Sequence, residues 1–431
     1  MTRISATYDI ETPSGLSHAA AVLAGEQSTG TFVRLASETD ELRDRSGARV
    51  ESVIQTGTST SPALPSRKTG DTYARGLVTV SWPMGNFGTS LPTLLSTLAG
   101  NLFELAELSA IRLVDVDLPP EFALDHPGPQ FGAEGTRAFM GDHRGPLIGT
   151  IIKPSIGFTA EETADLVRTL VGAGIDFIKD DELQANGPDC PFDDRLEAVM
   201  RVINDHADKT GKTVLYAANI TDEIDQMWRN LDRMQRVGAT CAMVCVNSVG
   251  LTGLRALRNR SDALIHGHRA GWGLFSRSPD IGVDFDVMQK LWRLAGADHL
   301  HVNGLANKFT ETDDTVARAA KSVQKPVCHD GGPAHTAMPV YSSGQTIWQI
   351  DAARKVLGND DFIYCSGGGI MSHPGGAADG VTSLRDAAEA ARAGVPLEDY
   401  AEPGSPLRKA MDSFGKPVLT LSGSGSGSGS G

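Results

Sequence analysis

The chain lacks long hydrophobic runs and an excess of positive charge. No segment approaches the roughly 20 consecutive apolar residues of a membrane span, and the N-terminus MTRISATYDIETP has no apolar stretch typical of a signal peptide. The formal net charge of -14 disfavours a nucleic-acid or anionic-membrane surface, because such partners attract clustered Lys and Arg. We therefore expect a cytoplasmic protein with no nucleic-acid or membrane partner, although a small anion could bind at a local site.

Closely spaced cysteine pairs are also missing. The five cysteines are scattered and form no CxxC pair, which indicates reduced thiols in a cytosolic protein. Cys241 and Cys245 fall within an apolar, strand-like run, and we predict that they pack in the core and do not bind a metal.

What the chain does contain, over 431 residues, is a repeated alternation of apolar runs and helical patterns from residue 145 onward. The predicted strands are, in order, LIGTIIKPS, DFIKDDE, TVLYAANIT, CAMVCVNSV, ALIHGHRA, HLHVNG, KPVCHDGG and DFIYCSGGG. Eight such units in about 250 residues favour a closed (β/α)8 TIM barrel over the competing architecture, a doubly wound open sheet.

The first 140 residues lack this alternation and predict a separate, smaller domain. The predicted strands there are ISATYDIET, GLVTVSWP and SAIRLVDVDLP, and the predicted helices are GLSHAAAVLAGEQS and SLPTLLSTLAGNLFELA. This mixture indicates an α+β, ferredoxin-like domain over residues 1–140. The barrel with a C-terminal helical extension is predicted over 141–415, and residues 416–431 form a tail that ends in an SGSGSGSGSG linker, which we interpret as engineered.

Four consecutive charges end the second predicted barrel strand, at the end where TIM barrels place their active sites. With a strand period of two, Lys179 and Asp181 point the same way, Asp180 points the other way, and Glu182 begins the loop. Two carboxylates suit Mg²⁺. A lysine ammonium cannot be a ligand, but a carbamate formed from its amine and CO₂ would be one. The alternative is a buried Lys–Asp salt bridge that closes the barrel.

Glycines follow the last two predicted strands. The GGG run at residues 367–369 offers backbone N–H groups to a phosphate, and Gly331 and Gly332 extend this site, although GGG would equally suit an ordinary tight loop. Arg269 and His301 could hold a second anionic group on the opposite side.

These motifs resemble a known family. GTIIKPSIG, GIDFIKDDE, HGHRA, DHLHVNG and SGGGIMSHPGG are similar, in order and spacing, to the barrel motifs of the RuBisCO large subunit and its RuBisCO-like (form IV) relatives. EQSTGTF and GNLFELAELSAIRLVDVDLP agree with the N-terminal domain of that family. The resemblance covers roughly residues 5 to 415.

The resemblance implies a metal-assisted reaction through an enediolate. It makes Lys179 the carbamylated lysine, which would bind Mg²⁺ together with Asp181 and Glu182. The other implied catalytic residues are Lys153 for acid–base chemistry, His268 beside the metal, and Lys308 on a mobile loop over the reacting carboxylate.

The resemblance also implies a phosphorylated small-molecule substrate and a shared active site. Arg269 and His301 are similar to one phosphate site of the family, and Thr31, Gly332, Gly367 and Gly368 to the other. Glu26 and Asn101 would come from the N-terminal domain of a second subunit, which implies a homodimer or a higher homo-oligomer.

Three departures from the family pattern argue against a CO₂-fixing carboxylase. Ser155 replaces the second lysine of the KPK motif, Trp272 replaces a histidine and could simply pack, and Asp330 stands at a serine of a phosphate site. An acidic side chain is unfavourable in an anion site unless it is paired, so a bisphosphate substrate is not expected.

The resemblance is compatible with several activities other than CO₂ fixation. We expect decarboxylation, or carboxyl transfer or hydrolysis, of 3-oxo-isoapionate 4-phosphate in carbohydrate catabolism, because decarboxylation of a β-keto acid needs an electron sink more than a strong base. The alternative enzymes are methylthioribulose-1-phosphate isomerase and 2,3-diketo-5-methylthiopentyl-1-phosphate enolase of methionine salvage. A barrel that only binds or regulates is a further alternative, whose expected feature, loss of the metal-binding residues, is not seen.

Overall fold

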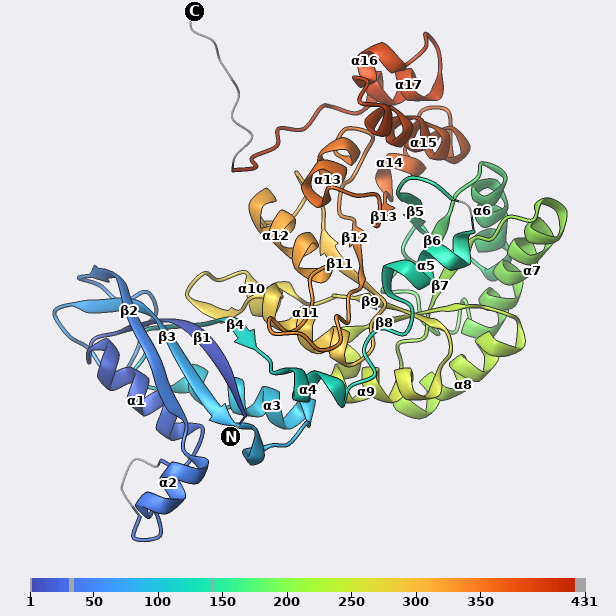
Figure 1. Cartoon of the computed structure of the whole chain (residues 1–431). Coiled ribbons are helices and arrows are strands. Elements are labelled where there is room, and N and C mark those ends of the chain that lie inside the picture. Colours follow the sequence, from blue (N-terminus) through green and yellow to red (C-terminus); the bar gives the residue numbers. More distant parts are fainter. Residues whose placement is uncertain (1, 31–34, 142, 423–431) are drawn as a thin grey trace, which may run out of the picture. The chain divides into compact units, whose positions relative to one another are not determined.

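The computed structural model describes residues 2–30, 35–141 and 143–422 (Figure 1). The chain divides into two compact units. The first unit consists of Met1–Gly128, Gly271–Ala295 and Pro326–His335, and the second of Pro129–Ala270, Gly296–Lys325 and Thr336–Gly431. The division therefore differs from a single boundary at residue 140, because two segments from within the predicted barrel range join the first unit.

The first unit contains a five-stranded sheet with the strand order β10-β4-β1-β3-β2. Its strands are β1 (Arg3–Thr12), β2 (Arg49–Ser59), β3 (Tyr73–Pro83), β4 (Ala110–Asp117) and β10 (Ile281–Val283). β1 pairs antiparallel with β3 and β4, whereas β10 pairs parallel with β4. Alternate residues of β1 are buried, and α1 (Leu16–Glu26) covers one face of the sheet (Figure 1). This α+β unit confirms the fold class predicted for the N-terminal part.

The other helices of the first unit are short. They are α2 (Asp40–Ser46), η1 (Met84–Asn86), α3 (Leu91–Leu98), η2 (Leu102–Glu104), α4 (Pro120–Leu124), α10 (Gly273–Ser276) and α11 (Phe285–Leu294). Trp272 is buried against α11, with its ring centroid 5.5 Å from that of Trp292 and 5.9 Å from that of Phe285. Trp272 therefore packs in the core of this unit, which was one of the roles that the sequence left open.

The second unit is a closed barrel of eight parallel strands in the order β11-β12-β13-β5-β6-β7-β8-β9, which confirms the predicted TIM barrel (Figure 1). The strands are β5 (Leu147–Ile151), β6 (Phe177–Lys179), β7 (Leu215–Asn219), β8 (Cys241–Cys245), β9 (Leu264–His268), β11 (His299–Asn303), β12 (Met338–Tyr341) and β13 (Ile363–Cys365). Their buried side chains, among them Phe177, Cys241 and Met338, form the core. All five cysteines are buried and free, including Cys241 and Cys245, for which core packing was predicted.

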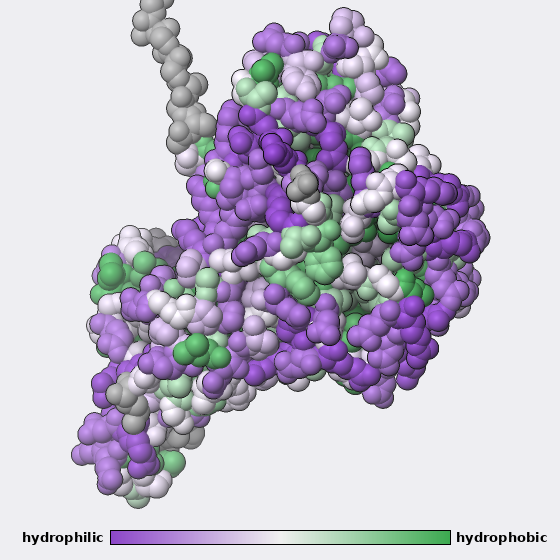
Figure 2. Space-filling view, turned by 45° about the vertical axis from the view of Figure 1, so that its right-hand side comes forward, coloured by the Kyte–Doolittle hydropathy of each residue, from purple (hydrophilic) through white to green (hydrophobic). Residues whose placement is uncertain are grey.

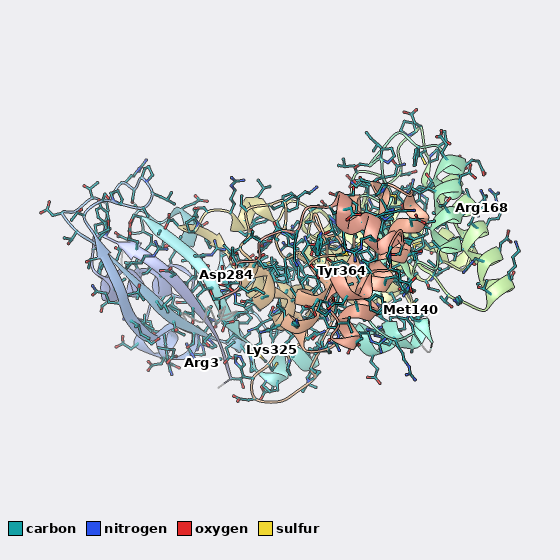
Figure 3. The ribbon with its side chains drawn as sticks, turned by 90° about the horizontal axis from the view of Figure 1, so that it is seen from above. Arg3, Met140, Arg168, Asp284, Lys325 and Tyr364 are labelled. Atoms are coloured by element: carbon teal, nitrogen blue, oxygen red, sulfur yellow. The ribbon has the colours of Figure 1, made fainter. Side chains whose placement is uncertain are left out.

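Helices surround this barrel. They are α5 (Gly132–Met140), α6 (Ala160–Gly172), α7 (Phe192–Thr210), α8 (Ile224–Arg236), α9 (Val246–Arg260), α12 (Asp313–Val323), α13 (Ile350–Leu357), α14 (Gly368–Met371), α15 (Ala377–Ala393), α16 (Leu397–Tyr400) and α17 (Pro406–Ser413). Figure 3 shows Arg168 on α6 at the outer edge of the barrel unit. Tyr364 of β13, also labelled there, is fully buried, and its hydroxyl donates to the Thr346 carbonyl at 2.7 Å. Hydrophilic residues cover much of the surface in Figure 2. No helix among the described residues is long and apolar enough to cross a membrane.

The seventh barrel strand was predicted wrongly. KPVCHDGG was predicted as this strand, but the structure forms it from MPVY at Met338–Tyr341. The earlier segment lies in the first unit, where Gly331 and Gly332 turn the chain with φ of 95° and 83° and the Val327 N–H donates to the Ala334 carbonyl at 3.1 Å. His329, Asp330 and both glycines therefore do not follow a barrel strand.

Candidate active site

The four charges at the end of β6 separate into two groups. Asp180 is fully buried and accepts hydrogen bonds from Arg195 of α7 (3.2 Å), from the Tyr216 hydroxyl (2.6 Å) and from the Asn219 backbone N–H (2.9 Å). Burial, followed by the Asp180 charge, raises the pKa of Tyr216, so its hydroxyl stays protonated and donates. Asp180 is therefore a structural residue, and it points away from the Lys179 and Asp181 side chains as the strand period predicts.

Replacing Arg195 with alanine is expected to destabilise the protein strongly. Both partners of the Arg195–Asp180 pair are almost fully buried, and removal of one partner from such a pair costs about 3–5 kcal/mol because a buried charge is left unpaired. The measurement is the urea midpoint of unfolding. Arg201→Ala on the same helix, which breaks an exposed pair with Glu161, is the control and should leave the midpoint unchanged. Equal midpoints for the two variants would contradict the structural role of Arg195.

Lys179 and Asp181 lie on the side of the strand end opposite to Asp180, but their side chains do not form an ion pair with each other. The Lys179 Nζ donates to the Asp180 carbonyl at 2.6 Å. The Asp181 carboxylate accepts instead from Lys153, at the end of β5, with an Nζ to Oδ2 distance of 2.5 Å. The Lys153 Nζ also donates to the Ser155 hydroxyl at 2.7 Å. The predicted alternative of a lysine–aspartate salt bridge is thus observed in part, with Lys153 and not Lys179 as the lysine.

His268 connects this group to β9. Its Nδ1 accepts the Ala270 backbone N–H at 3.2 Å, so the proton of the neutral ring lies on Nε2, which is 3.6 Å from a Glu182 carboxylate oxygen. Burial holds the pKa of His268 well below its usual 6.5, and the charge of Lys179 lowers it further. The structure thus brings five of the predicted residues together: Lys153, Lys179, Asp181, Glu182 and His268.

A chain of buried histidines continues from this site into the barrel. His301 Nδ1 is 3.1 Å from the Ser342 hydroxyl, and its Nε2 is 2.8 Å from His266 Nε2. His266 Nδ1 is 3.3 Å from His299 Nδ1, and His299 Nε2 is 2.9 Å from the Thr136 hydroxyl. Burial lowers the pKa of all three histidines, that of His299 to about 3, so the rings are neutral. His301 was predicted as an anion ligand, but in the structure both of its ring nitrogens lie within hydrogen-bond distance of buried partners, His266 and Ser342.

Arg269 was predicted to bind phosphate, but in the structure it is paired with a carboxylate. Its guanidinium donates to both carboxylate oxygens of Glu311, which lies in the loop after β11. The Asn303 side-chain amide donates to the same carboxylate at 2.6 Å. Neither Glu311 nor Asn303 was predicted from the sequence as a site residue.

The loop after β13 leaves open space at the barrel mouth. A methyl group on Gly368 would meet no described atom within 4 Å, and one on Gly367 would meet Ile151 Cδ1 at 3.6 Å, whereas one on Gly369 would lie 2.4 Å from the Ser366 hydroxyl. The first two glycines therefore leave room for a ligand, and the third is required for packing. The loop that really follows the seventh strand contains residues 342–344, which were not predicted.

Lys308 is exposed in the loop after β11. Its Nζ is 5.3 Å from the ring centroid of Phe309. A Cβ on Gly344 would lie 3.6 Å from the Lys308 backbone nitrogen, so this loop lies against the loop after β12. The position of Lys308 over a reacting carboxylate stays a prediction.

The predicted residues of the first unit have mixed outcomes. Glu26 and Asn101 are both exposed, and their segments are neighbours, because the Gln27 amide can accept the Asn101 backbone N–H at 3.0 Å. Thr31 lies outside the described residues. Gly332 is corrected to a turn residue of this unit, since a Cβ there would lie 3.0 Å from Pro120 Cβ.

The donor set fits Mg²⁺ if Lys179 is carbamylated. No group of three His, Cys, Asp or Glu side chains within residues 2–30, 35–141 and 143–422 is arranged to hold a metal. Asp181 and Glu182 supply two adjacent carboxylates, and Mg²⁺ is usually bound by one or two carboxylates with water and substrate oxygens. A carbamate on Lys179 would add a third anionic oxygen ligand.

Comparisons with known proteins cover nearly the whole chain. Residues 132–414 match the family model of the ribulose bisphosphate carboxylase large chain, catalytic domain, and residues 2–122 match that of the N-terminal domain. A protein of Xanthobacter autotrophicus named 3-oxo-isoapionate-4-phosphate transcarboxylase/hydrolase is 52% identical, over 95% of this chain and 98% of that protein. A Rhizobium etli protein named 3-oxo-isoapionate-4-phosphate decarboxylase is 40% identical over 95% and 98%. The crystal structure of a RuBisCO-like protein from Burkholderia fungorum superposes with a TM-score of 0.90 at 38% identity, over 96% of this chain and 100% of that one.

Proposed function

The chain belongs to the RuBisCO large-chain family, and from this premise we propose that it cleaves the carboxyl group from 3-oxo-isoapionate 4-phosphate through an enediolate. Two relatives at 52% and 40% identity are named for reactions of this one substrate. The observation that carries the proposal is the cluster at the barrel mouth, where the Lys153 ammonium lies 2.5 Å from Asp181, beside Glu182 and His268. The Lys153 ammonium has three N–H donors, of which Asp181 and Ser155 accept two, so one can donate to an enediolate oxygen.

The proposed substrate is a β-keto acid, so the reaction can begin without removal of a C–H proton. Cleavage of the C1–C2 bond releases CO₂ and leaves the electron pair on C2, C3 and the C3 oxygen as an enediolate. A proton returned to C2 gives a ketotetrose phosphate. Alternatively, CO₂ adds to C3, and water then cleaves the C2–C3 bond to give a two-carbon hydroxy acid and a three-carbon phosphorylated acid. Both outcomes share the first step.

The side chains of the cluster have distinct proposed roles. The Lys153 ammonium stabilises the developing oxyanion and supplies a proton, with Asp181 and the Ser155 hydroxyl holding its Nζ in place. His268, a neutral imidazole with its proton on Nε2, orients Glu182. Lys308 closes over the departing carboxylate, and the open backbone at Gly367 and Gly368 receives the phosphate.

The proposed cofactor is Mg²⁺ held by carbamylated Lys179, Asp181 and Glu182, and when bound it supplies Lewis-acid stabilisation of the oxyanion. Asp181 would then hold Lys153 and the cofactor with one carboxylate. Glu26 and Asn101, exposed on neighbouring segments, are proposed to complete the site of a second subunit in a homodimer or larger homo-oligomer. A cytoplasmic location is part of the same proposal.

The proposal is tested by ³¹P NMR of the protein with 3-oxo-isoapionate 4-phosphate, Mg²⁺ and bicarbonate. A ketotetrose phosphate with release of CO₂ identifies a decarboxylase, and a two-carbon hydroxy acid identifies carboxyl transfer followed by hydrolysis. Protein treated with EDTA is expected to be inactive until Mg²⁺ is restored. If the substrate is unchanged in the complete mixture, the proposal is wrong, and methylthioribulose 1-phosphate is the next compound to test.

A further inference from the structure

We propose that Glu311 is a specificity residue that neutralises Arg269, so that this side of the barrel mouth receives an uncharged group of the substrate and rejects a second phosphoryl group. The inference rests on the proposed function and deepens it. It makes the site selective for sugar-acid monophosphates whose end remote from the phosphate is neutral, such as a hydroxymethyl group.

Glu311 is held firmly in place by Arg269 and Asn303. Arg269 directly follows β9, and only 10% of its side chain is exposed, against 18% for Glu311. The guanidinium donates to both carboxylate oxygens, which is the bidentate geometry that an arginine would otherwise offer to a phosphate. Asn303, the last residue of β11, donates to the same carboxylate at 2.6 Å. Glu311 thus has one partner directly after β9 and another at the end of β11.

The charges of Arg269 and Glu311 cancel each other. A buried arginine alone would attract an anion, but the Arg269–Glu311 pair has no net charge. A phosphoryl dianion that reached Arg269 would also approach the Glu311 carboxylate, and like charges brought together in a partly desolvated site repel each other. If the phosphoryl group displaced Glu311 from Arg269, the Glu311 carboxylate would remain largely buried without its cationic partner, which is unfavourable. Either route weakens binding of a second phosphoryl group.

The loop after β13 differs from this paired site. At Gly367 and Gly368 an added methyl group would meet at most one side-chain carbon within 4 Å among the described residues, so that side of the mouth has backbone groups and room. One phosphate site remains open while the other is neutralised. This asymmetry matches a substrate with a single phosphate.

The test is direct binding of two sugars that differ by one phosphoryl group. Ribulose 1,5-bisphosphate and ribulose 5-phosphate are titrated into wild type and Glu311→Gln by calorimetry. The amide of the variant keeps the size of the side chain and an oxygen that can accept from Arg269, so the fold should survive. We expect Glu311→Gln to bind the bisphosphate about tenfold more tightly or better, while the affinity for the monophosphate changes less than about threefold.

The control is Glu161→Gln, which removes the negative charge from the exposed Glu161–Arg201 ion pair on the outer helices. This variant should change neither affinity. An unchanged bisphosphate affinity in Glu311→Gln would overturn the inference. An equal gain for both sugars would also overturn it, because Glu311 would then occupy the position of the one phosphate that every substrate carries.

The binding readout does not depend on turnover, so this inference and the proposed function can fail separately. A selective gain in Glu311→Gln without cleavage of 3-oxo-isoapionate 4-phosphate would support the inference and reject the reaction. Cleavage without a selective gain would support the reaction and reject the role of Glu311.

Discussion

Lys179→Met is expected to lower kcat for carboxyl cleavage by about a thousandfold or more, because the proposed carbamate and its metal are lost together. The variant should still fold. Lys179 is fully buried, and its ammonium donates to the Asp180 backbone carbonyl and not to Asp181. Methionine has a similar length and suits a buried position. The loss should therefore be one of catalysis and not of structure.

The measurement combines turnover with thermal unfolding. Mg²⁺ and bicarbonate together should raise the melting temperature of wild type, because ligands that bind the folded state stabilise it, and they should leave that of Lys179→Met unchanged. Lys355→Met, which removes an exposed ammonium on α13, is the matched control and should behave as wild type. Full activity in Lys179→Met, or the same thermal shift as in wild type, would exclude a carbamate at this position.

The barrel could be predicted because its signal is local. Apolar runs and helical patterns alternate along the sequence, and parallel strands joined by helices have few possible arrangements. The seventh strand failed because KPVC and MPVY have similar apolar patterns, and only tertiary packing decides that Met338–Tyr341 enters the barrel. β2 was missed because most of its side chains are exposed, so it lacks the buried alternation of β1. β10 was missed because none of its three residues is buried, whereas β6 and β13 are equally short but fully buried.

The candidate site, like the fold, could be predicted only in part. The strand period correctly separates Asp180 from Lys179 and Asp181, because alternation is a property of the chain itself. The partners of these residues could not be predicted, since Lys153 reaches Asp181 from another strand. The pairing of Arg269 with Glu311 joins residues 42 positions apart and depends on the course of a loop. The histidines of β9 and β11 did give a signal, two residues apart in each strand, but their hydrogen bonds require the closed barrel.

Lys153→Met is expected to lower kcat about a hundredfold to a thousandfold while Mg²⁺ binding is kept. The ammonium is the positive charge that we place at the oxyanion, and loss of one such preorganised group typically has an effect of about this size. Asp181, which is buried and accepts from Lys153 at 2.5 Å, is then relieved of a competing cation. The thermal shift with Mg²⁺ and bicarbonate should therefore equal or exceed that of wild type, in contrast to Lys179→Met.

Ser155→Ala separates the charge of Lys153 from its positioning. This variant removes the hydroxyl that accepts from the Lys153 Nζ at 2.7 Å but keeps the ammonium and its contact with Asp181. Because one neutral hydrogen bond is lost and the charge remains, kcat should fall less than about tenfold. If Ser155→Ala were as inactive as Lys153→Met, the position of the ammonium and not its charge would limit the reaction. If Lys153→Met also lost the thermal shift with Mg²⁺ and bicarbonate, Lys153 would belong to the metal site and not to the chemical step.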